Sequence, residues 1–238
     1  MVIGTLVFAR CAGFVFRAPG FSHPSVPVAL RAGFALALGA VILPGISQRA
    51  PRLDGAAFAL GVVAEFLIGS VIGMTASLIY DAAYAGGRIV DDYVGVKAIA
   101  PSLQLVAPSG YGRIWSLAFT GAFFLSGAYR IALLAFAESF ERFPAGMPSF
   151  GTYWHQYSPA FATAFVQVAL RVAAPAIGMA FVAQVALGAL SRVVPRFGSF
   201  TLAFPLAFAA ALVAAAIAVP PAMRQAPAPI VDLMPHAP

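Results

Sequence analysis

Long apolar stretches alternate with short polar turns along most of this chain. Each stretch is close to, or longer than, the roughly 20 residues that a helix needs to cross the hydrocarbon layer of a membrane. The apolar residues run continuously, without the period of two that marks the strands of a membrane barrel. The pattern predicts membrane helices over the ranges 28–46, 56–80, 114–137, 160–190 and 197–223.

Four of these five stretches contain a single ionisable residue each. In chain order, these residues are Arg31, Glu65, Arg130 and Arg171. A charge within a membrane helix costs roughly 2.5–3.5 kcal/mol on insertion scales, so each one needs a structural or functional reason. The four side chains are therefore candidates for buried ion pairs.

Glu65 lies on the same helical face as two glycines. Gly69 and Gly73 follow it at intervals of four residues and form a GxxxG pair, which lets another backbone approach closely. One interpretation is simple packing between helices. The other makes Glu65 the buried partner of one of the three isolated arginines on a neighbouring helix.

The residues that follow the second apolar stretch carry a polar stripe. Its charged members are adjacent or recur at helical spacing, and they are Asp81, Arg88, Asp91 and Asp92. This spacing places them along one side of a helix. Two interpretations stay open: a solvated face outside the bilayer, or a face that lines a water-filled passage.

Residues 97–112 are mostly apolar, yet they cannot form one continuous helix because Pro101, Pro108, Gly110 and Gly112 interrupt them. Non-helical backbone at membrane depth is tolerated only where it is buried in protein or lines a cavity. The segment is therefore either an ordinary interfacial loop or a re-entrant loop that plugs a passage.

Composition agrees with a membrane protein. The chain of 238 residues is 61% hydrophobic and 9% charged, with a mean hydropathy of +0.91, whereas soluble domains are about 45–50% apolar and about 25% charged. We expect an all-α integral membrane fold, with a single membrane domain over 1–224 and a disordered tail over 225–238. The net charge of +6 comes from scattered arginines, which argues against nucleic acid as a partner.

No catalytic or metal-binding constellation is visible in the sequence. The histidines His23, His155 and His236 lack the spacing of metal ligands, and Cys11 is the single cysteine. We therefore expect no enzyme, no metal site and no cofactor, which leaves transport, conduction or assembly. One interpretation is a stand-alone secondary transporter or ion channel, with Glu65 and the arginines as an ion relay.

Several short motifs, spread from about residue 8 to residue 220, carry a resemblance to a known family. They are Ala9-Arg10-x-x-Gly13-Phe14, Ala18-Pro19-x-Phe21, Glu65-x-x-Ile68-Gly69-x-x-x-Gly73, Glu138-Ser139-Phe140, Pro144-x-Gly146 and Phe200-x-x-x-Phe204-Pro205. In this order and spacing the chain resembles the FliR/SctT family, the export-gate component shared by bacterial flagella and type III secretion injectisomes. It departs from the usual family pattern at Arg88, Gly198, Ala203 and Ala207.

The resemblance implies an assembly rather than a free-standing transporter. The chain would contribute bent helical hairpins to a helical export-gate complex in the bacterial inner (plasma) membrane, at the flagellar basal body or the injectisome base. Its partners would be FliP-like, FliQ-like and FlhB-like subunits and membrane lipid, and its cargo would be unfolded secreted proteins. Glu65, Gly69 and Gly73 would then pack hairpins or subunits together.

The resemblance also maps part of a pore plug onto residues 97–108. Apolar side chains there would exclude water, and hydrophobic constrictions close channels by dewetting. The residues assigned to the plug in this way are Lys97, Ile99, Pro101, Leu103, Leu105, Val106 and Pro108.

Overall fold

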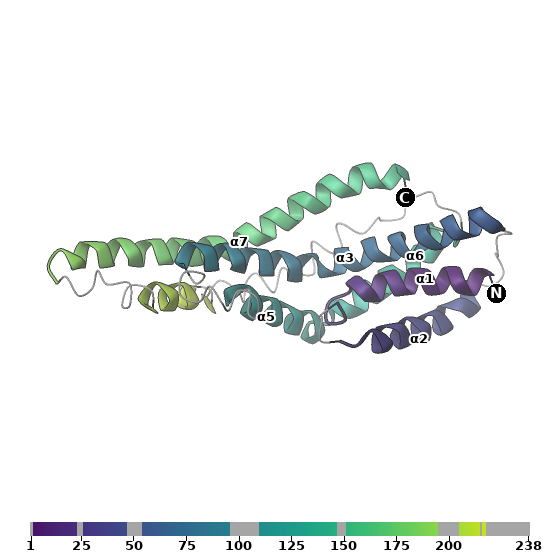
Figure 1. Ribbon diagram of the computed structural model, residues 1–238, viewed down its shortest axis with the longest axis horizontal. Helices are drawn as coiled ribbons and strands as arrows, with labels where there is room; N and C mark the ends of the chain where they lie inside the picture. Colours follow the sequence, from purple (N-terminus) through teal and green to yellow (C-terminus); the bar gives the residue numbers. More distant parts are fainter. Residues whose placement is uncertain are drawn as a thin grey trace. The chain divides into compact units, whose positions relative to one another are not determined.

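The structure is a computed structural model (Figure 1). It describes residues 2–22, 26–46, 54–95, 110–146, 151–194, 205–214 and 216–217. Every regular element within these ranges is a helix. The predicted all-α fold is confirmed.

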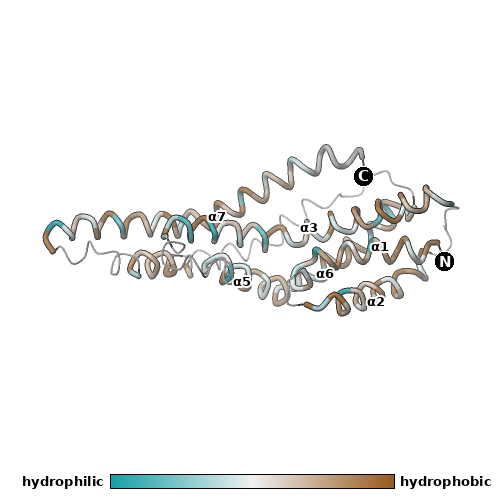
Figure 2. Tube along the Cα trace, viewed as in Figure 1, coloured by the Kyte–Doolittle hydropathy of each residue, from teal (hydrophilic) through white to brown (hydrophobic). Residues whose placement is uncertain are grey.

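The first two helices pack side by side as a hairpin. α1 covers Val2–Arg17, and α2 covers Val28–Ile46, which is the range that the sequence predicted. Apolar residues predominate along both helices (Figure 2), but only Ala35 and Gly39 of α2 are buried. An apolar helix with so little protein cover is typical of one that faces lipid or another chain.

α3 is a single helix over Gly55–Val94. The sequence predicted two segments here, an apolar one and one with a polar stripe, and no proline separates them near Tyr80. With 40 residues, α3 is about 60 Å long, twice the roughly 30 Å of a bilayer core. A simple count of spans therefore underestimates how far this helix extends.

The predicted helix over 114–137 is divided in two. α5 covers Tyr111–Leu125 and α6 covers Ala128–Arg142. Gly127 lies between them with φ +78°, a left-handed conformation that glycine adopts without steric penalty. The prediction of one uninterrupted helix is wrong at this glycine.

α7 covers Gly151–Ser191. It begins before the predicted stretch of 160–190, and it is not divided at Pro175 or Gly178, where the sequence suggested a kink or a break. A shorter apolar helix, Pro205–Ala214, follows it.

Contacts within the chain define two compact units. They comprise the described residues of Met1–Leu78 with Phe123–Ala162, and of Ile79–Ala122 with Thr163–Ala226. In the core of the first unit α1 meets α6, where the rings of Phe14 and Phe136 stack with their centroids 4.4 Å apart. The predicted tail at 225–238 lies outside the described residues.

Among the residues described, three helices are long and apolar enough to cross a membrane, and a fourth span results if α5 and α6 count as one. The three are α2, α3 and the part of α7 over Ser158–Ser191. Many of their large apolar side chains are exposed, including Val41 and Leu60. Lipid or other chains must cover this surface, as expected for the predicted integral membrane protein.

Candidate functional site

A buried ion pair joins α1 to α3 in the first unit. Arg10 of α1 is completely buried, and Glu65 of α3 is 2% exposed. Arg10 Nε donates a hydrogen bond to Glu65 Oε2. Two charges removed from water are compensated only when the geometry is good and further hydrogen bonds satisfy both groups.

The other donors of Arg10 reach the C-terminal end of α6. Nη1 donates to the Ser139 carbonyl oxygen at 3.0 Å, and Nη2 donates to the Phe143 carbonyl oxygen at 2.8 Å. The Arg10 Cζ also lies 4.2 Å from the centroid of the Phe140 ring. Because the last carbonyls of a helix lack intrahelical partners and form the negative end of its dipole, a guanidinium there is a favourable cap.

Glu65 has a second partner in the turn after α6. Its Oε1 accepts a hydrogen bond from the backbone N–H of Gly146 at 2.8 Å. Gly146 has φ +83°, a conformation in which a side chain would strain the backbone. Glu65 thus ties this turn to α3, while Arg10 ties the end of α6 to α1.

The sequence named the wrong arginines as partners of Glu65, because Arg10 occupies that place. Arg31 is half-buried against an aromatic ring, and Arg130 and Arg171 are exposed. Arg10 was overlooked as a candidate because α1 has only 16 residues, fewer than a membrane span requires.

The family resemblance contained the signal that could have found Arg10. Arg10, Glu65, Ser139 and Gly146 each belong to one of its motifs. They are far apart in the sequence and meet in one buried cluster. We refer to these four residues below as the Arg10 cluster.

Glycines let α1 and α3 cross in backbone contact beside this cluster. A Cβ atom added at Gly69 would overlap the carbonyl oxygen of Arg10 and lie 2.9 Å from the nitrogen of Phe14. One added at Gly73 would lie 2.6 Å from the carbonyl oxygen of Phe14, and one at Gly13 would overlap the backbone of α3. Small residues at such a crossing let membrane helices approach closely.

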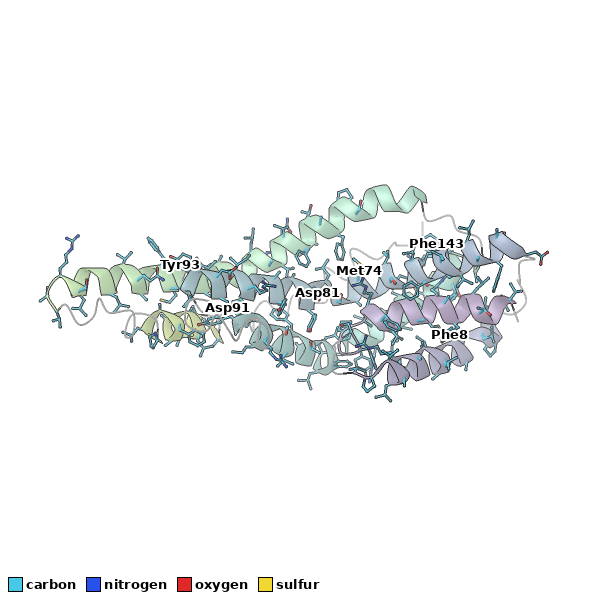
Figure 3. The ribbon with its side chains drawn as sticks, viewed as in Figure 1. Phe8, Met74, Asp81, Asp91, Tyr93 and Phe143 are labelled. Atoms are coloured by element: carbon cyan, nitrogen blue, oxygen red, sulfur yellow. The ribbon has the colours of Figure 1, made fainter. Side chains whose placement is uncertain are left out.

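A second buried carboxylate lies near the C-terminal end of α3, in the second unit (Figure 3). Asp91 is 1% exposed. Its Oδ1 accepts a hydrogen bond from the backbone N–H of Tyr111 at 3.0 Å, and its Oδ2 accepts one from Gly112 at 3.4 Å. The first amides of a helix have no intrahelical acceptor, so Asp91 caps the N-terminus of α5 from another helix.

The structure therefore divides the predicted polar stripe. Asp81, Arg88 and Asp92 are exposed, whereas Asp91 is buried. The exposed members still suit either a solvated face or the wall of a water-filled passage. The predicted plug at 97–108 lies outside the described residues, but Asp91 joins the two helices that flank it.

No group of three or more His, Cys, Asp or Glu side chains that could hold a metal ion comes together in the part of the chain that the structure describes. The Arg10 cluster and the Asp91 cap each surround a carboxylate with hydrogen-bond donors. This arrangement fixes helices relative to their immediate neighbours.

The chain matches the family described as bacterial export proteins, family 1, over residues 1–229. It is 29% identical over 209 residues to flagellar biosynthetic protein FliR of Bacillus subtilis (strain 168), covering 84% of this chain and 79% of that protein. It is 24% identical over 214 residues to FliR of Caulobacter vibrioides, covering 85% of this chain and 82% of that protein. It is also 26% identical over 185 residues to Yop proteins translocation protein T of Yersinia pestis, covering 75% of this chain and 70% of that protein.

Proposed function

Because the chain belongs to the family of bacterial export proteins, family 1, we propose that it is a membrane subunit of a type III protein export apparatus. This membership confirms the resemblance to the FliR/SctT family. The similar proteins include a flagellar biosynthetic protein and a Yop translocation protein, so the similarity is compatible with a flagellum or an injectisome.

The observation that carries the proposal is the extent of the family match. It spans residues 1–229 and so includes every helix described above. The Arg10 cluster supports it, because motif residues from three separate parts of the chain are spent on one buried structural contact. The cluster holds helices in place, which fits a structural role in an export apparatus better than catalysis.

The exposed apolar helices favour a subunit that functions within a larger complex. In our proposal FliP-like, FliQ-like and FlhB-like subunits cover part of this surface and lipid of the bacterial inner membrane covers the rest. Unfolded secreted proteins are the cargo of the assembled gate. This arrangement accounts for helices such as α3 that exceed the thickness of a bilayer core.

Within that gate, residues 97–108 form part of the plug that closes the pore. The segment contains Ile99, Leu103, Leu105 and Val106 between two prolines. Apolar side chains in a narrow passage expel water and so block ions, yet they form no covalent barrier to a polypeptide. Such a closure can open for cargo and close again.

Deleting residues 97–108 is expected to raise the ion conductance of the assembled gate severalfold, because water then enters the pore. The measurement uses planar bilayers and the chain assembled with FliP-like and FliQ-like subunits. A deletion of the same length at residues 227–238 serves as the control and should leave conductance unchanged. An assembled complex without residues 97–108 that conducts like the wild type would refute the plug.

A further inference from the structure

Asp91 connects the two sides of the proposed plug segment. Its backbone carbonyl oxygen accepts the N–H of Gly95 at 3.1 Å, at the end of α3. Its side chain accepts the N–H groups of Tyr111 and Gly112, at the start of α5. One residue therefore holds the last ordered turn before the segment and the first turn after it.

The setting of the carboxylate makes this connection strong. Asp91 is almost completely buried, and its two oxygens face amides at the positive end of the α5 dipole. Hydrogen bonds to an ionised acceptor are about twice as strong as those between neutral groups. The helix N-terminus also supplies the partial positive charge that a buried carboxylate requires.

Two further contacts hold the start of α5. A Cβ atom at Gly87 of α3 would lie 2.7 Å from the carbonyl carbon of Tyr111, so the backbones of α3 and α5 touch here. The Tyr111 hydroxyl donates a hydrogen bond to the carbonyl oxygen of Phe208, and the centroids of these two rings are 4.7 Å apart. The start of α5 is thus held by α3 on one side and by the helix Pro205–Ala214 on the other.

Glycines mark both places where the chain leaves this frame. Gly95 has φ +85°, which only glycine adopts readily. Gly110 lies against Asp91, since a Cβ atom there would be 3.3 Å from Oδ1. The frame is fixed by Asp91 and Tyr111, and the chain changes direction at the glycines that border it.

We propose that Asp91 is the positioning residue of the pore plug, which keeps the two ends of segment 97–108 together so that the plug returns to one closed position. The inference rests on the proposed function of that segment. It assigns to Asp91 a role in closure that goes beyond capping α5. Its exposed neighbour Asp92, one residue further along α3, has no such role.

The test compares Asp91→Asn, Asp91→Ala and the control Asp92→Asn in the assembled complex. Asparagine keeps the shape of the side chain but places an N–H donor opposite one of the two amides. We expect Asp91→Asn to raise ion conductance roughly tenfold and Asp91→Ala more, up to about a hundredfold, since buried charge-assisted hydrogen bonds are lost. Asp92→Asn should conduct like the wild type.

Complex yield and thermal unfolding are measured on the same samples. If Asp91→Asn lowers the unfolding temperature while conductance stays at the wild-type level, Asp91 is only a helix cap and the inference is overturned. If the deletion of residues 97–108 leaks but neither Asp91 variant does, the positioning role fails and the plug stands. If the deletion itself does not leak, the proposed function of the segment fails.

Discussion

Replacing Glu65 with alanine is expected to speed the labelling of Cys11 by a maleimide about a hundredfold or more. Cys11 is the only cysteine of the chain, is completely buried, and follows Arg10 on α1. Glu65→Ala leaves the Arg10 guanidinium buried without its counter-charge, which typically costs about 3–5 kcal/mol. Because every 1.4 kcal/mol is a factor of about ten, the population in which α1 opens should rise accordingly.

The exposed pair of Arg142 and Glu138 provides a matched control. These side chains lie 3.4 Å apart on one face of α6, and Glu138 is 58% exposed. An exposed pair at this helical spacing contributes only about 0.3–0.5 kcal/mol, so Glu138→Ala should label Cys11 almost as slowly as the wild type. Equal labelling rates in Glu65→Ala and Glu138→Ala would show that the buried pair does not hold α1.

Removing both charges should recover only part of the lost stability. In the double variant Arg10→Met with Glu65→Met, no buried charge is left unpaired. The carbonyl oxygens of Ser139 and Phe143 nevertheless lose the donors that Arg10 supplied. Each buried acceptor left without a partner costs about 1–3 kcal/mol, so labelling should fall between the wild type and Glu65→Ala.

Gly69→Ala is expected to be the second most damaging change. The added methyl group would overlap the carbonyl oxygen of Arg10, and backbone cannot rotate away as a side chain can. Overpacking of this kind costs about 1–3 kcal/mol, and here the shift also moves Arg10 relative to Glu65. The thermal unfolding temperature in detergent should fall, and Cys11 labelling should accelerate.

Gly33→Ala is the control for this substitution. Gly33 lies in α2 with nothing within 4 Å of an added Cβ atom. Alanine is favoured over glycine in a helix by about 1 kcal/mol, so this variant should be as stable as the wild type or slightly more stable. A Gly69→Ala protein with an unchanged unfolding temperature would contradict the close crossing of α1 and α3.

The sequence predicted the helices where the apolar pattern alone decides them. α2 has the predicted bounds because a proline-rich loop precedes it and Pro44 and Gly45 stand in its last turn. The break at Gly127 was missed because a glycine inside an apolar run is compatible with a continuous helix. The backbone conformation that divides α5 from α6 depends on contacts that the sequence pattern does not contain.

The site was predicted in part for a similar reason. The pattern identified Glu65, Gly69 and Gly73 as one face of a helix, and α1 lies against that face. It could not identify Arg10 as the partner, because which helix packs on which face follows from the three-dimensional arrangement. Asp91 was grouped with its exposed neighbours, since helical spacing alone does not show which member of a stripe is buried.

Co-purification tests most directly whether this chain is an export-gate subunit. The chain is tagged and expressed with and without FliP-like and FliQ-like subunits from the same bacterium, and the mass of the purified species is measured in detergent. We predict one complex that contains all three subunits, and an unstable chain when the partners are absent. A stable homo-oligomer of the chain alone that transports ions or small solutes would contradict the proposed function.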